Sequence, residues 1–429
     1  MTTAGIISEY NPFHLGHAGH IRQTRELLGD DCAIMCLMSG NFVQRGDFAV
    51  FSKHARARAA VLSGADLVIE LPVPYVLSSA EGFAKAGVDI LTKTGVCDNL
   101  SFGSESGQIE SLAEAAEALA SETTQKRLRE WMDKGLSYAT AMQKTAGETP
   151  GMDSEVIMTP NNLLGIEYIK AINKTGSPLK PMTCLRTGGS HDGTGGFSAS
   201  WLRSLLEQGF TEQCLVKQGF TEQVLTEAVL TEAVLAKPIL TGHDFEELRA
   251  YMPEAAYNIC IEEILALRGP VFSDAAEQAI LSRLRAMNDF SRIQGVSEGL
   301  DRRFLQYATT EPSVSAVLEK IKTKRYSMSR LRRVLLCACL GLYSDAIPAA
   351  PPYIRVLATN STGMLLLKKM RKKARLPVII KPASARRLSN DALRVFNMEA
   401  AATDFYVLAY PGASNRAGGG EWKQTPVIV

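Results

Sequence analysis

The chain has 429 residues, of which 46% are hydrophobic and 21% charged, with a formal net charge of +2. This is the composition of a globular protein of two or three domains, and it argues against uniform polyanion binding while leaving room for a local basic face. The longest apolar stretch, residues 67–77, is interrupted by Glu70, Pro72 and Pro74, which excludes a membrane-spanning helix there. Because no secretion signal opens the chain, a cytoplasmic location is expected.

Residues 4–206 alternate strand-like and helix-like segments. This alternation predicts an α/β fold with a doubly wound, Rossmann-like parallel sheet covered by helices. In such sheets ligands bind at the carboxyl ends of the strands. The expected strands are residues 4–7, 33–38, 65–71, 99–103 and 182–186.

Three of the six histidines, His14, His17 and His20, lie within seven residues directly after the first expected strand. A helix is expected over residues 21–28, so these side chains lie at a strand-to-helix turn, where backbone N–H groups attract anions. Gly16 leaves room for close approach of a ligand to the backbone. Such donors suit the negative charge that develops when a nucleotide α-phosphate is attacked. The alternative for any one of these histidines is local capping and packing.

The eight cysteines form no CxxC pair and lie mostly in apolar runs. This favours buried thiols over a redox or zinc site, and no metal site is predicted. The cysteines are Cys32, Cys36, Cys97, Cys184, Cys214, Cys260, Cys337 and Cys339.

Short tandem repeats follow the alternating region. The sequence of residues 208–213 recurs at 218–223, and that of residues 226–230 recurs at 231–235. These spacings match no solenoid, so we interpret them as a duplication in a tolerant surface segment. Residues 207–254 are therefore predicted to be a linker between a domain of residues 1–206 and a region of residues 255–429.

The C-terminal region is predicted to contain two kinds of structure. Residues 255–342 are predicted to be mainly helical, with a break at 309–312, and a small strand–helix–strand unit is predicted over residues 354–380. The chain from residue 410 onward is predicted to be loop-like.

A basic window overlaps these elements. Between residues 321 and 387 the chain has sixteen Lys or Arg residues, and Asp345 is the only acidic one. Such a window predicts RNA binding, with Tyr326 as a candidate for stacking on a base; the alternative is a solvated helix face. The candidate RNA-binding residues, which would be tRNA-binding residues under the resemblance described next, are Lys322, Lys324, Arg325, Arg332, Arg333, Lys368, Lys369, Arg371 and Lys372.

The histidine turn resembles that of the HxGH nucleotidyltransferase superfamily, whose members bind ATP or CTP. With residues 9–14, 40–47, 64–72, 101–105, 160–168 and 323–326 included, nearly the whole chain resembles the tRNA(Met) cytidine acetate ligases. The resemblance implies a nucleotidyltransferase-type N-terminal fold and an ATP-dependent ligase. It would activate acetate as acetyl-adenylate and acetylate N4 of the wobble cytidine of elongator tRNA(Met). Magnesium would accompany ATP, and no obligate protein partner is expected. The duplicated stretch departs from the family.

The same resemblance implies the site residues. His14 and His17 would be catalytic, and residues 198–203 resemble a second phosphate-binding motif, although Ser198 or Ser200 is equally suited to be a helix N-cap. Asn161 is the alternative to Asn162, one position away. The implied ATP contacts are Ile7, Ser8, Glu9, Tyr10, Asn11, Pro12, Phe13, His14, Leu15, Gly16, His17, Ala18, Gly19, His20, Gly103, Asn162, Arg186, Ser200 and Arg203.

Other polar residues keep two interpretations. Lys53, Arg56 and Arg58, around His54, form either a substrate contact or a solvated helix face, and His191-Asp192 favours a loop hydrogen bond over catalysis.

Two rival functions also fit the sequence in part. They are an adenylyltransferase of a small phosphorylated metabolite, which would need no RNA, and a non-catalytic RNA-binding protein.

Overall fold

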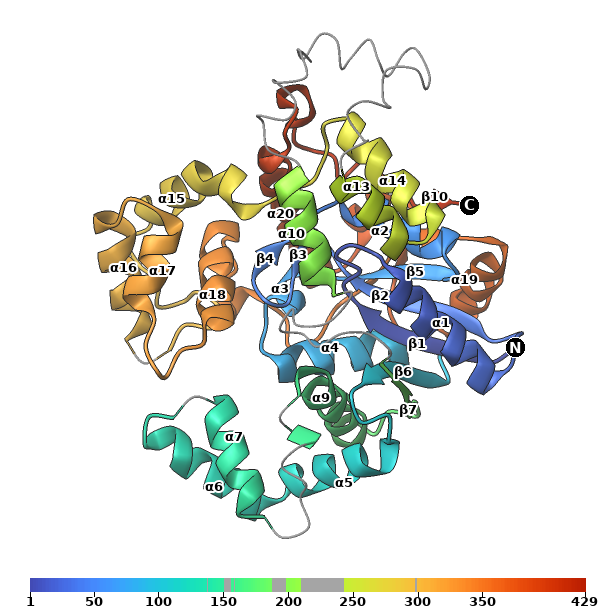
Figure 1. Ribbon diagram of the computed structural model, residues 1–429, viewed down its shortest axis with the longest axis horizontal. Helices are drawn as coiled ribbons and strands as arrows, with labels where there is room; N and C mark the ends of the chain where they lie inside the picture. Colours follow the sequence, from blue (N-terminus) through green and yellow to red (C-terminus); the bar gives the residue numbers. More distant parts are fainter. Residues whose placement is uncertain (137, 150–155, 158, 187–197, 210–242, 298) are drawn as a thin grey trace.

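The structure is a computed structural model that describes residues 1–429 except 137, 150–155, 158, 187–197, 210–242 and 298. At its centre lies a sheet of eight strands in the order β10-β8-β5-β2-β1-β6-β7, with β9 beside β8 (Figure 1). The repeats at 208–235, most of the predicted linker, Cys214 and His191-Asp192 lie in whole or in part outside the described residues.

The N-terminal strands form the predicted parallel sheet. The chain order reverses between β1 and β6, and the carboxyl ends of these two strands are where doubly wound sheets bind their ligands. All five strands lie within two residues of their expected bounds at each end. They are β1 (Thr3–Ser8), β2 (Ala33–Ser39), β5 (Leu67–Leu71), β6 (Asn99–Ser104) and β7 (Lys180–Leu185).

Helices and a small hairpin connect these strands. The first helix begins at Leu15, before the expected residue 21, because His14 caps it. The other connections are the hairpin β3 (Phe42–Val43) and β4 (Asp47–Phe48), and the helices α1 (Leu15–Leu28), α2 (Lys53–Leu62), α3 (Val73–Val76), α4 (Ala80–Lys93), α5 (Ile109–Ala120), α6 (Glu122–Asp133), α7 (Tyr138–Gly147), α9 (Pro160–Thr175) and α10 (Ala199–Gly209).

The C-terminal strands complete the same sheet. Strand β8 (Ile354–Thr359) pairs antiparallel with β5, while β9 (Val378–Ile379) and β10 (Val427–Ile428) pair parallel with β8. The predicted strand–helix–strand elements are therefore present, but they belong to the sheet begun at residue 3 rather than to a separate unit. The division at residues 206 and 254 stays a prediction.

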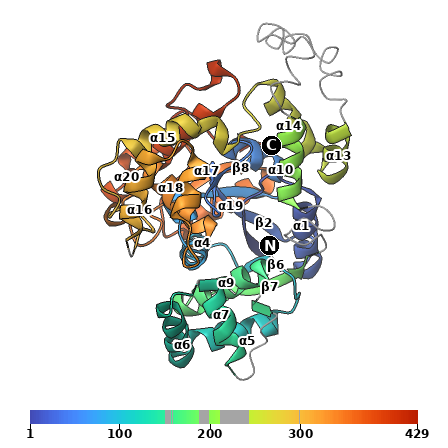
Figure 2. The same ribbon diagram turned by 60° about the vertical axis from the view of Figure 1, so that its left-hand side comes forward.

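The remaining chain is mainly helical, as expected, and the predicted break separates α16 from α17. Figure 1 and Figure 2 both place α15–α18 on one side of the sheet and α5–α7 below it. The helices are α13 (His243–Tyr251), α14 (Glu254–Leu265), α15 (Glu277–Arg285), α16 (Leu300–Thr310), α17 (Val314–Ile321), α18 (Met328–Leu340), α19 (Ser361–Lys373) and α20 (Asn390–Tyr406), with 3₁₀ turns η1 (Ser273–Ala276), η2 (Ser344–Ala346), η3 (Pro382–Arg387), η4 (Val407–Ala409) and η5 (Ala413–Asn415).

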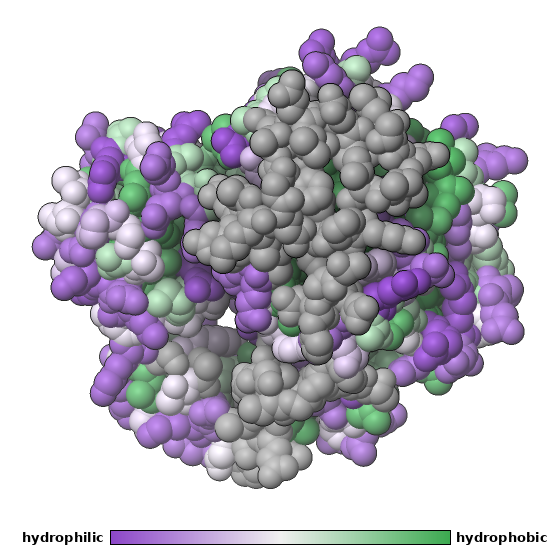
Figure 3. All heavy atoms as spheres, turned by 45° about the horizontal axis from the view of Figure 1, so that its top comes forward, coloured by the Kyte–Doolittle hydropathy of each residue, from purple (hydrophilic) through white to green (hydrophobic). Residues whose placement is uncertain are grey.

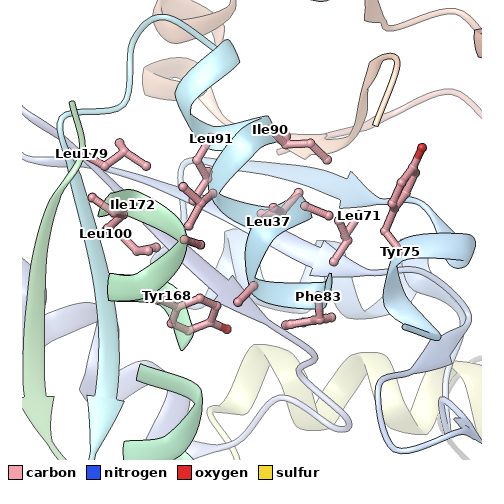
Figure 4. Packing of buried hydrophobic residues seen from close by; sticks show 14 of the residues in the cluster. Leu37, Leu71, Tyr75, Phe83, Ile90, Leu91, Leu100, Tyr168, Ile172 and Leu179 are labelled. Carbon is pink, nitrogen blue, oxygen red and sulfur yellow. The ribbon is translucent and has the colours of Figure 1, made fainter. Parts of the chain in front are cut away.

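The main core lies where α4 and α9 cover one face of the sheet. In Figure 4, Leu37 and Leu71 of the sheet meet Phe83 and Leu91 of α4 and other apolar side chains. Every residue of β2 is buried, because a parallel sheet is covered on both faces and its strands therefore consist of continuous apolar runs. Six of the seven described cysteines are also buried, which confirms them as core thiols, and Cys97 is half-buried.

The described surface is mostly hydrophilic on the face that Figure 3 shows, with apolar side chains scattered among polar ones. Among the helices of the described chain, none combines the length and apolar character needed to cross a membrane.

Helix α2 carries a buried ion cluster. The Lys53 Nζ lies 2.6 Å from Glu70, 3.1 Å from Glu399 and 2.7 Å from Glu421, and all four side chains are at most 1% exposed. Burial alone would lower the pKa of Lys53, but the three carboxylates outweigh it and raise that pKa. Burial, reinforced by the charge of Glu399, also raises the pKa of Glu70 well above its usual value, which favours its protonated form.

The charged residues of α2 therefore have structural partners. Lys53 and Arg56 are buried, so neither belongs to a solvated face, and Arg56 donates to the backbone carbonyls of Phe51, Ser39 and others nearby. Only Arg58 is exposed, and it pairs with Glu262 at 2.5 Å. His54 is half-buried, and this burial lowers its pKa well below the ordinary value.

Replacing the buried cation tests this cluster. We expect Lys53→Met to lower the free energy of unfolding by about 3–5 kcal/mol, because it removes the one ammonium group that contacts the buried carboxyl groups of Glu70, Glu399 and Glu421. Urea unfolding measures the loss. The control Arg58→Met removes an exposed ion pair on the same helix and is expected to cost less than about 1 kcal/mol. A loss below about 1 kcal/mol for Lys53→Met would contradict the structural role of the cluster.

Candidate active site

The turn after β1 is bonded to the loop between β2 and α2. The Glu9 carboxylate accepts a hydrogen bond from the backbone N–H of Gln44 (2.6 Å), and the Asn11 side-chain oxygen accepts one from Val50 N–H (2.8 Å). The Arg56 guanidinium donates to the carbonyl of Glu9. The shape of the turn is thus imposed by residues some 35 to 47 positions later in the chain.

His14 and His17 begin α1 with a reciprocal cap. The His14 Nδ1 accepts from Gly16 N–H at 3.0 Å, and the His17 Nδ1 accepts from His14 N–H at 3.2 Å. Their rings stack with centroids 3.7 Å apart. Because each Nδ1 is an acceptor, the proton of each neutral ring is on Nε2. Local capping and a ligand role are therefore compatible: Nδ1 makes the cap, and Nε2–H remains the ring's donor.

The space for this arrangement comes from Gly16. A Cβ at this position would lie 2.8 Å from His14 Cε1, closer than real side chains approach. The glycine lets the His14 ring fold back over the first turn of the helix. On the other side, the His17 ring packs edge-on against Tyr10, whose hydroxyl lies 3.1 Å from Cys36 Sγ.

The three histidines of the turn are neutral at physiological pH. Burial lowers the pKa of His14 to about 4, with the positive charges of Arg186 and Arg203 acting in the same direction. Burial likewise lowers the pKa of His17 well below 6.5, and that of His20 to about 4. The His20 Nε2 lies 2.9 Å from Ser101 Oγ of β6. The turn therefore presents N–H donors rather than fixed cations.

Gly103 and Arg186 meet at the ends of β6 and β7. A Cβ on Gly103 would lie 3.0 Å from Arg186 Cγ, so the glycine allows the arginine side chain to pass close to the strand. The Arg186 backbone N–H donates to Ser104 O at 3.0 Å. Since its charge acts on His14, His17 and His20, Arg186 belongs to the same electrostatic site.

The asparagine pair braces the loop after β6. The buried Asn162 oxygen accepts from the N–H groups of Glu105 (2.9 Å) and Ser106 (3.2 Å). In return the Glu105 carboxylate accepts from Asn162 N–H (2.9 Å) and from the Asn161 side chain (2.5 Å). Sequence reasoning assigned no role to Glu105, although it lies in one of the segments that carry the family resemblance.

Helix α10 supplies the last part of the site. The Ser198 Oγ accepts from Trp201 N–H at 3.2 Å, which makes Ser198 a helix cap, and the Ser200 Oγ lies 2.9 Å from it. The Arg203 guanidinium donates to Asn11 O at 2.8 Å. The structure therefore brings the predicted residues of the turn, Gly103, Asn162, Arg186, Ser200 and Arg203 to the carboxyl edge of β1, β6 and β7; their contacts with ATP stay a prediction.

The basic residues form two separate groups. The first lies on the α17–α18 segment beside the active site, where Arg333 donates to Gln44 O at 3.3 Å; it comprises Lys322, Lys324, Arg325, Arg332 and Arg333. The second lies on α19, whose C-terminal end joins the end of α4 through Arg375 N–H and Lys93 O (2.8 Å); it comprises the exposed Lys368, Lys369, Arg371 and Lys372. Figure 1 places α18 and α19 on opposite sides of the molecule.

Tyr326 does not belong to an exposed stacking surface, so that expectation was wrong. Its side chain is 6% exposed and packs in the helical core with Leu331 and other apolar residues. The guanidinium of Arg330 lies 5.2 Å from its ring centroid. An aromatic residue next to basic ones in sequence is here an anchor for the start of α18.

The chain as a whole matches known proteins. The HIGH nucleotidyl transferase family matches residues 1–420. The tRNA(Met) cytidine acetate ligases of Acetivibrio thermocellus and Thermosipho africanus are each 32% identical to this chain, with complete coverage of both chains in each comparison. The chain belongs to this family.

Solved structures agree with this membership. The crystal structure of Thermotoga maritima TmcAL bound with alpha-thio ATP covers all of both chains with a TM-score of 0.84 and 32% identity, and the apo form has a TM-score of 0.85. The tRNA(Met) cytidine acetate ligase family and the α/β fold predicted from the sequence are thereby confirmed.

The neutral histidines of this tRNA(Met) cytidine acetate ligase family member predict acid sensitivity. The folded-state pKa of His20 is about 4, below its ordinary 6.5, so the stability that depends on the neutral ring is complete above pH 6.5 and is lost toward pH 4. We expect the stability advantage of the wild type over His20→Gln to fall by at most about 1.4 kcal/mol per pH unit in this window. Urea unfolding at several pH values measures it. A difference that is constant with pH would contradict the lowered pKa of His20 in the folded protein.

Proposed function

We propose that this protein is an ATP-dependent tRNA acetate ligase that forms N4-acetylcytidine at the wobble position of elongator tRNA(Met). The observation that carries the proposal is the pair His14 and His17, whose Nδ1 atoms are committed to the helix cap and whose Nε2–H groups lie with Arg186 at the carboxyl edge of the sheet. Membership in the tRNA(Met) cytidine acetate ligase family supports the choice of substrates.

The first step joins acetate to AMP. An acetate oxygen attacks the ATP α-phosphorus, the bond to the β-phosphate oxygen breaks, and pyrophosphate leaves. Negative charge grows on the phosphoryl oxygens, where neutral N–H donors and arginine guanidinium groups stabilise it. His14, His17 and Arg186 are preorganised for this by the cap and the adjoining strands. Acetate is itself the nucleophile, so the protein need not supply one.

The second step transfers the acetyl group. The cytidine N4 amine attacks the carbonyl carbon of acetyl-adenylate, and AMP leaves with the bridging oxygen. An aromatic amine is a weak nucleophile, so holding it against an activated acyl group supplies much of the rate. The tRNA would be held by the basic residues of α17–α18, since these adjoin the loop whose Gln44 contacts the histidine turn.

Several expectations complete the proposal. Magnesium would accompany ATP through phosphate oxygens and water, the usual mode for a nucleotide-bound ion. Among the described residues, no three His, Cys, Asp or Glu side chains are grouped to hold a metal, and we assign no step to the ion. A cytoplasmic location and action without an obligate protein partner remain predictions.

The activity is tested with pure protein, ATP, magnesium, labelled acetate and elongator tRNA(Met), each omitted in turn. N4-acetylcytidine is detected by nucleoside mass spectrometry. Product that requires both ATP and acetate supports the ligase. AMP transfer to a small phosphorylated metabolite without an RNA product would instead indicate an adenylyltransferase, and RNA binding without turnover would indicate a binding protein.

The histidine pair is tested by His17→Ala. We expect acetate-dependent exchange of labelled pyrophosphate into ATP to fall at least 100-fold, because a donor to the developing charge is lost, while tRNA affinity stays within about twofold. The control Leu27→Ala changes an exposed residue of the same helix, 63% accessible, and should leave exchange at the wild-type rate. Normal exchange in His17→Ala would remove this histidine from the mechanism.

The two basic groups are tested separately by salt dependence. Replacing Lys322, Lys324 and Arg325 with alanine should reduce the slope of log Kd against log salt by about 2. Each phosphate contact that is lost means that fewer counterions are released when the tRNA binds. A second variant replaces Lys368, Lys369, Arg371 and Lys372 on α19. Filter binding of tRNA(Met) at several salt concentrations measures both. An unchanged slope for either variant would exclude that group from the tRNA interface.

A further inference from the structure

Tyr10 belongs to the histidine turn, but its side chain is directed into the protein core. It is 2% exposed and lies in the same apolar cluster as Phe13 and Cys36. Its hydroxyl lies 3.1 Å from the Sγ of Cys36, which pairs in the parallel sheet with Ile6, ahead of the end of β1 at Ser8. The ring therefore reaches back beneath the turn, and its hydroxyl is directed away from the carboxyl edge of the sheet.

The backbone of Tyr10 is adapted to this direction of the side chain. Its φ is +47°, in the left-handed region that residues other than glycine seldom adopt. Such a conformation persists only where the surroundings impose it, and it is frequent at functional sites. Here the contact with Cys36 and the burial of the ring impose it. Because Tyr10 lies between β1 and His14, the path of the turn depends on where this ring is anchored.

Three aromatic rings surround the imidazole of His17. The His14 ring stacks on it with centroids 3.7 Å apart, and the Phe13 ring lies tilted at 5.5 Å. The Tyr10 ring packs edge-on at 4.9 Å, with an interplanar angle of 68°, and also packs edge-on against Phe13 at 4.8 Å.

These rings complete what the helix cap begins. The hydrogen bond from His14 N–H fixes only one atom of the His17 ring, the Nδ1. A single hydrogen bond leaves the ring free to tilt, whereas contacts with neighbouring rings restrict that motion. The direction of the His17 Nε2–H is therefore set jointly by the cap and by Tyr10 and Phe13.

We propose that Tyr10 is a positioning residue that acts through His17 and that its side chain does not contact ATP. Its ring, anchored at Cys36, holds the His17 imidazole in the capping orientation, with Nε2–H directed to the carboxyl edge of the sheet. This inference rests on the proposed function, in which that N–H stabilises the charge that grows on the phosphoryl oxygens. For the Tyr10 side chain it replaces the ATP contact that the family resemblance implies.

The anchor between Tyr10 and Cys36 is neutral. Burial raises the pKa of Tyr10 well above its ordinary value of 10, and it raises the pKa of Cys36 to about 12. Both groups are therefore protonated at physiological pH, and either can donate to the other. Such an anchor does not change with pH in this range, which suits a residue that holds a ring in place.

Tyr10→Leu and Tyr10→Phe test the role by acetate-dependent exchange of labelled pyrophosphate into ATP. Leucine removes both the ring and the hydroxyl, so we expect the maximal exchange rate to fall about tenfold or more, while the KM for ATP stays within about threefold. Phenylalanine keeps the ring contact and should retain about a third or more of the wild-type rate. A raised KM with a normal maximal rate in Tyr10→Leu would indicate a direct ATP contact and overturn the proposal.

The matched control Phe290→Leu separates positioning from a general loss of stability. The Phe290 ring is buried in the helical core, where it stacks on Phe304 with centroids 5.7 Å apart. The substitution removes a buried ring away from the histidine turn, and the folded variant should exchange pyrophosphate at the wild-type rate. An equal loss of exchange in Phe290→Leu and Tyr10→Leu would contradict a positioning role for Tyr10.

The protonation of the His17 ring gives a readout that needs no activity. In protein labelled with ¹⁵N at histidine, the His17 Nδ1 should have the chemical shift of an unprotonated nitrogen and Nε2 that of a protonated one, because Nδ1 accepts from His14 N–H. His17→Gln identifies these signals by their loss. In Tyr10→Leu the ring should leave the cap, and exchange between tautomers should move the two shifts toward each other.

Unchanged His17 shifts in Tyr10→Leu would overturn the proposal, because the ring would then keep its orientation without Tyr10. Absence of acetate-dependent exchange in the wild type, together with the expected change of the His17 shifts in Tyr10→Leu, would instead refute the proposed function. The two failures are therefore distinguishable.

Discussion

Helix α2 is the constraint on which the rest of the structure depends. Lys53 at its start forms ion pairs with carboxylates of β5, α20 and the C-terminal segment. Arg56, one turn later, donates a hydrogen bond to the carbonyl of Glu9 in the histidine turn. Both cations are buried, so each would be costly if its partners were absent. The end of the chain is thereby required for the geometry at its beginning. This also explains why β8 and β10 complete the N-terminal sheet: the segments that carry Arg355 and Glu421 must reach the same cluster.

Burial also decides the protonation state of the histidines in the turn. Histidines at a phosphate site are commonly pictured as cations, but those of this turn are held neutral by burial and by the charges of Arg186 and Arg203. Neutral rings with Nδ1 used in the helix cap have a defined tautomer, and their Nε2–H groups need no reorganisation as charge develops on the phosphate. The permanent positive charge is supplied by arginine, which stays protonated in any environment.

The local helices and strands and most of the site residues could be predicted from the sequence, but their partners far away in the chain could not. Strands such as β2 were predictable because a fully buried parallel strand is a continuous apolar run, and the His14–His20 cluster follows the first of them directly. Lys53 was open to a surface interpretation because Glu399, which pairs with it, is 346 residues away. Tyr326 was misjudged because the basic residues around it suggested an exposed surface, whereas the packing of α17 and α18 buries its ring. The placement of α18 and α19 on opposite sides of the molecule likewise depends on the topology of the fold, which cannot be read from the number of basic residues in the window.

The central claim is that an acetate oxygen attacks the ATP α-phosphorus at the histidine turn. It is tested most directly by supplying acetate labelled with ¹⁸O in both oxygens, together with ATP and tRNA(Met), and analysing the products by mass spectrometry. The account predicts that each AMP released carries one ¹⁸O atom, because the bridging oxygen of acetyl-adenylate stays with phosphorus when the amine takes the acetyl group. Unlabelled AMP, or ¹⁸O in inorganic phosphate with release of ADP, would contradict it.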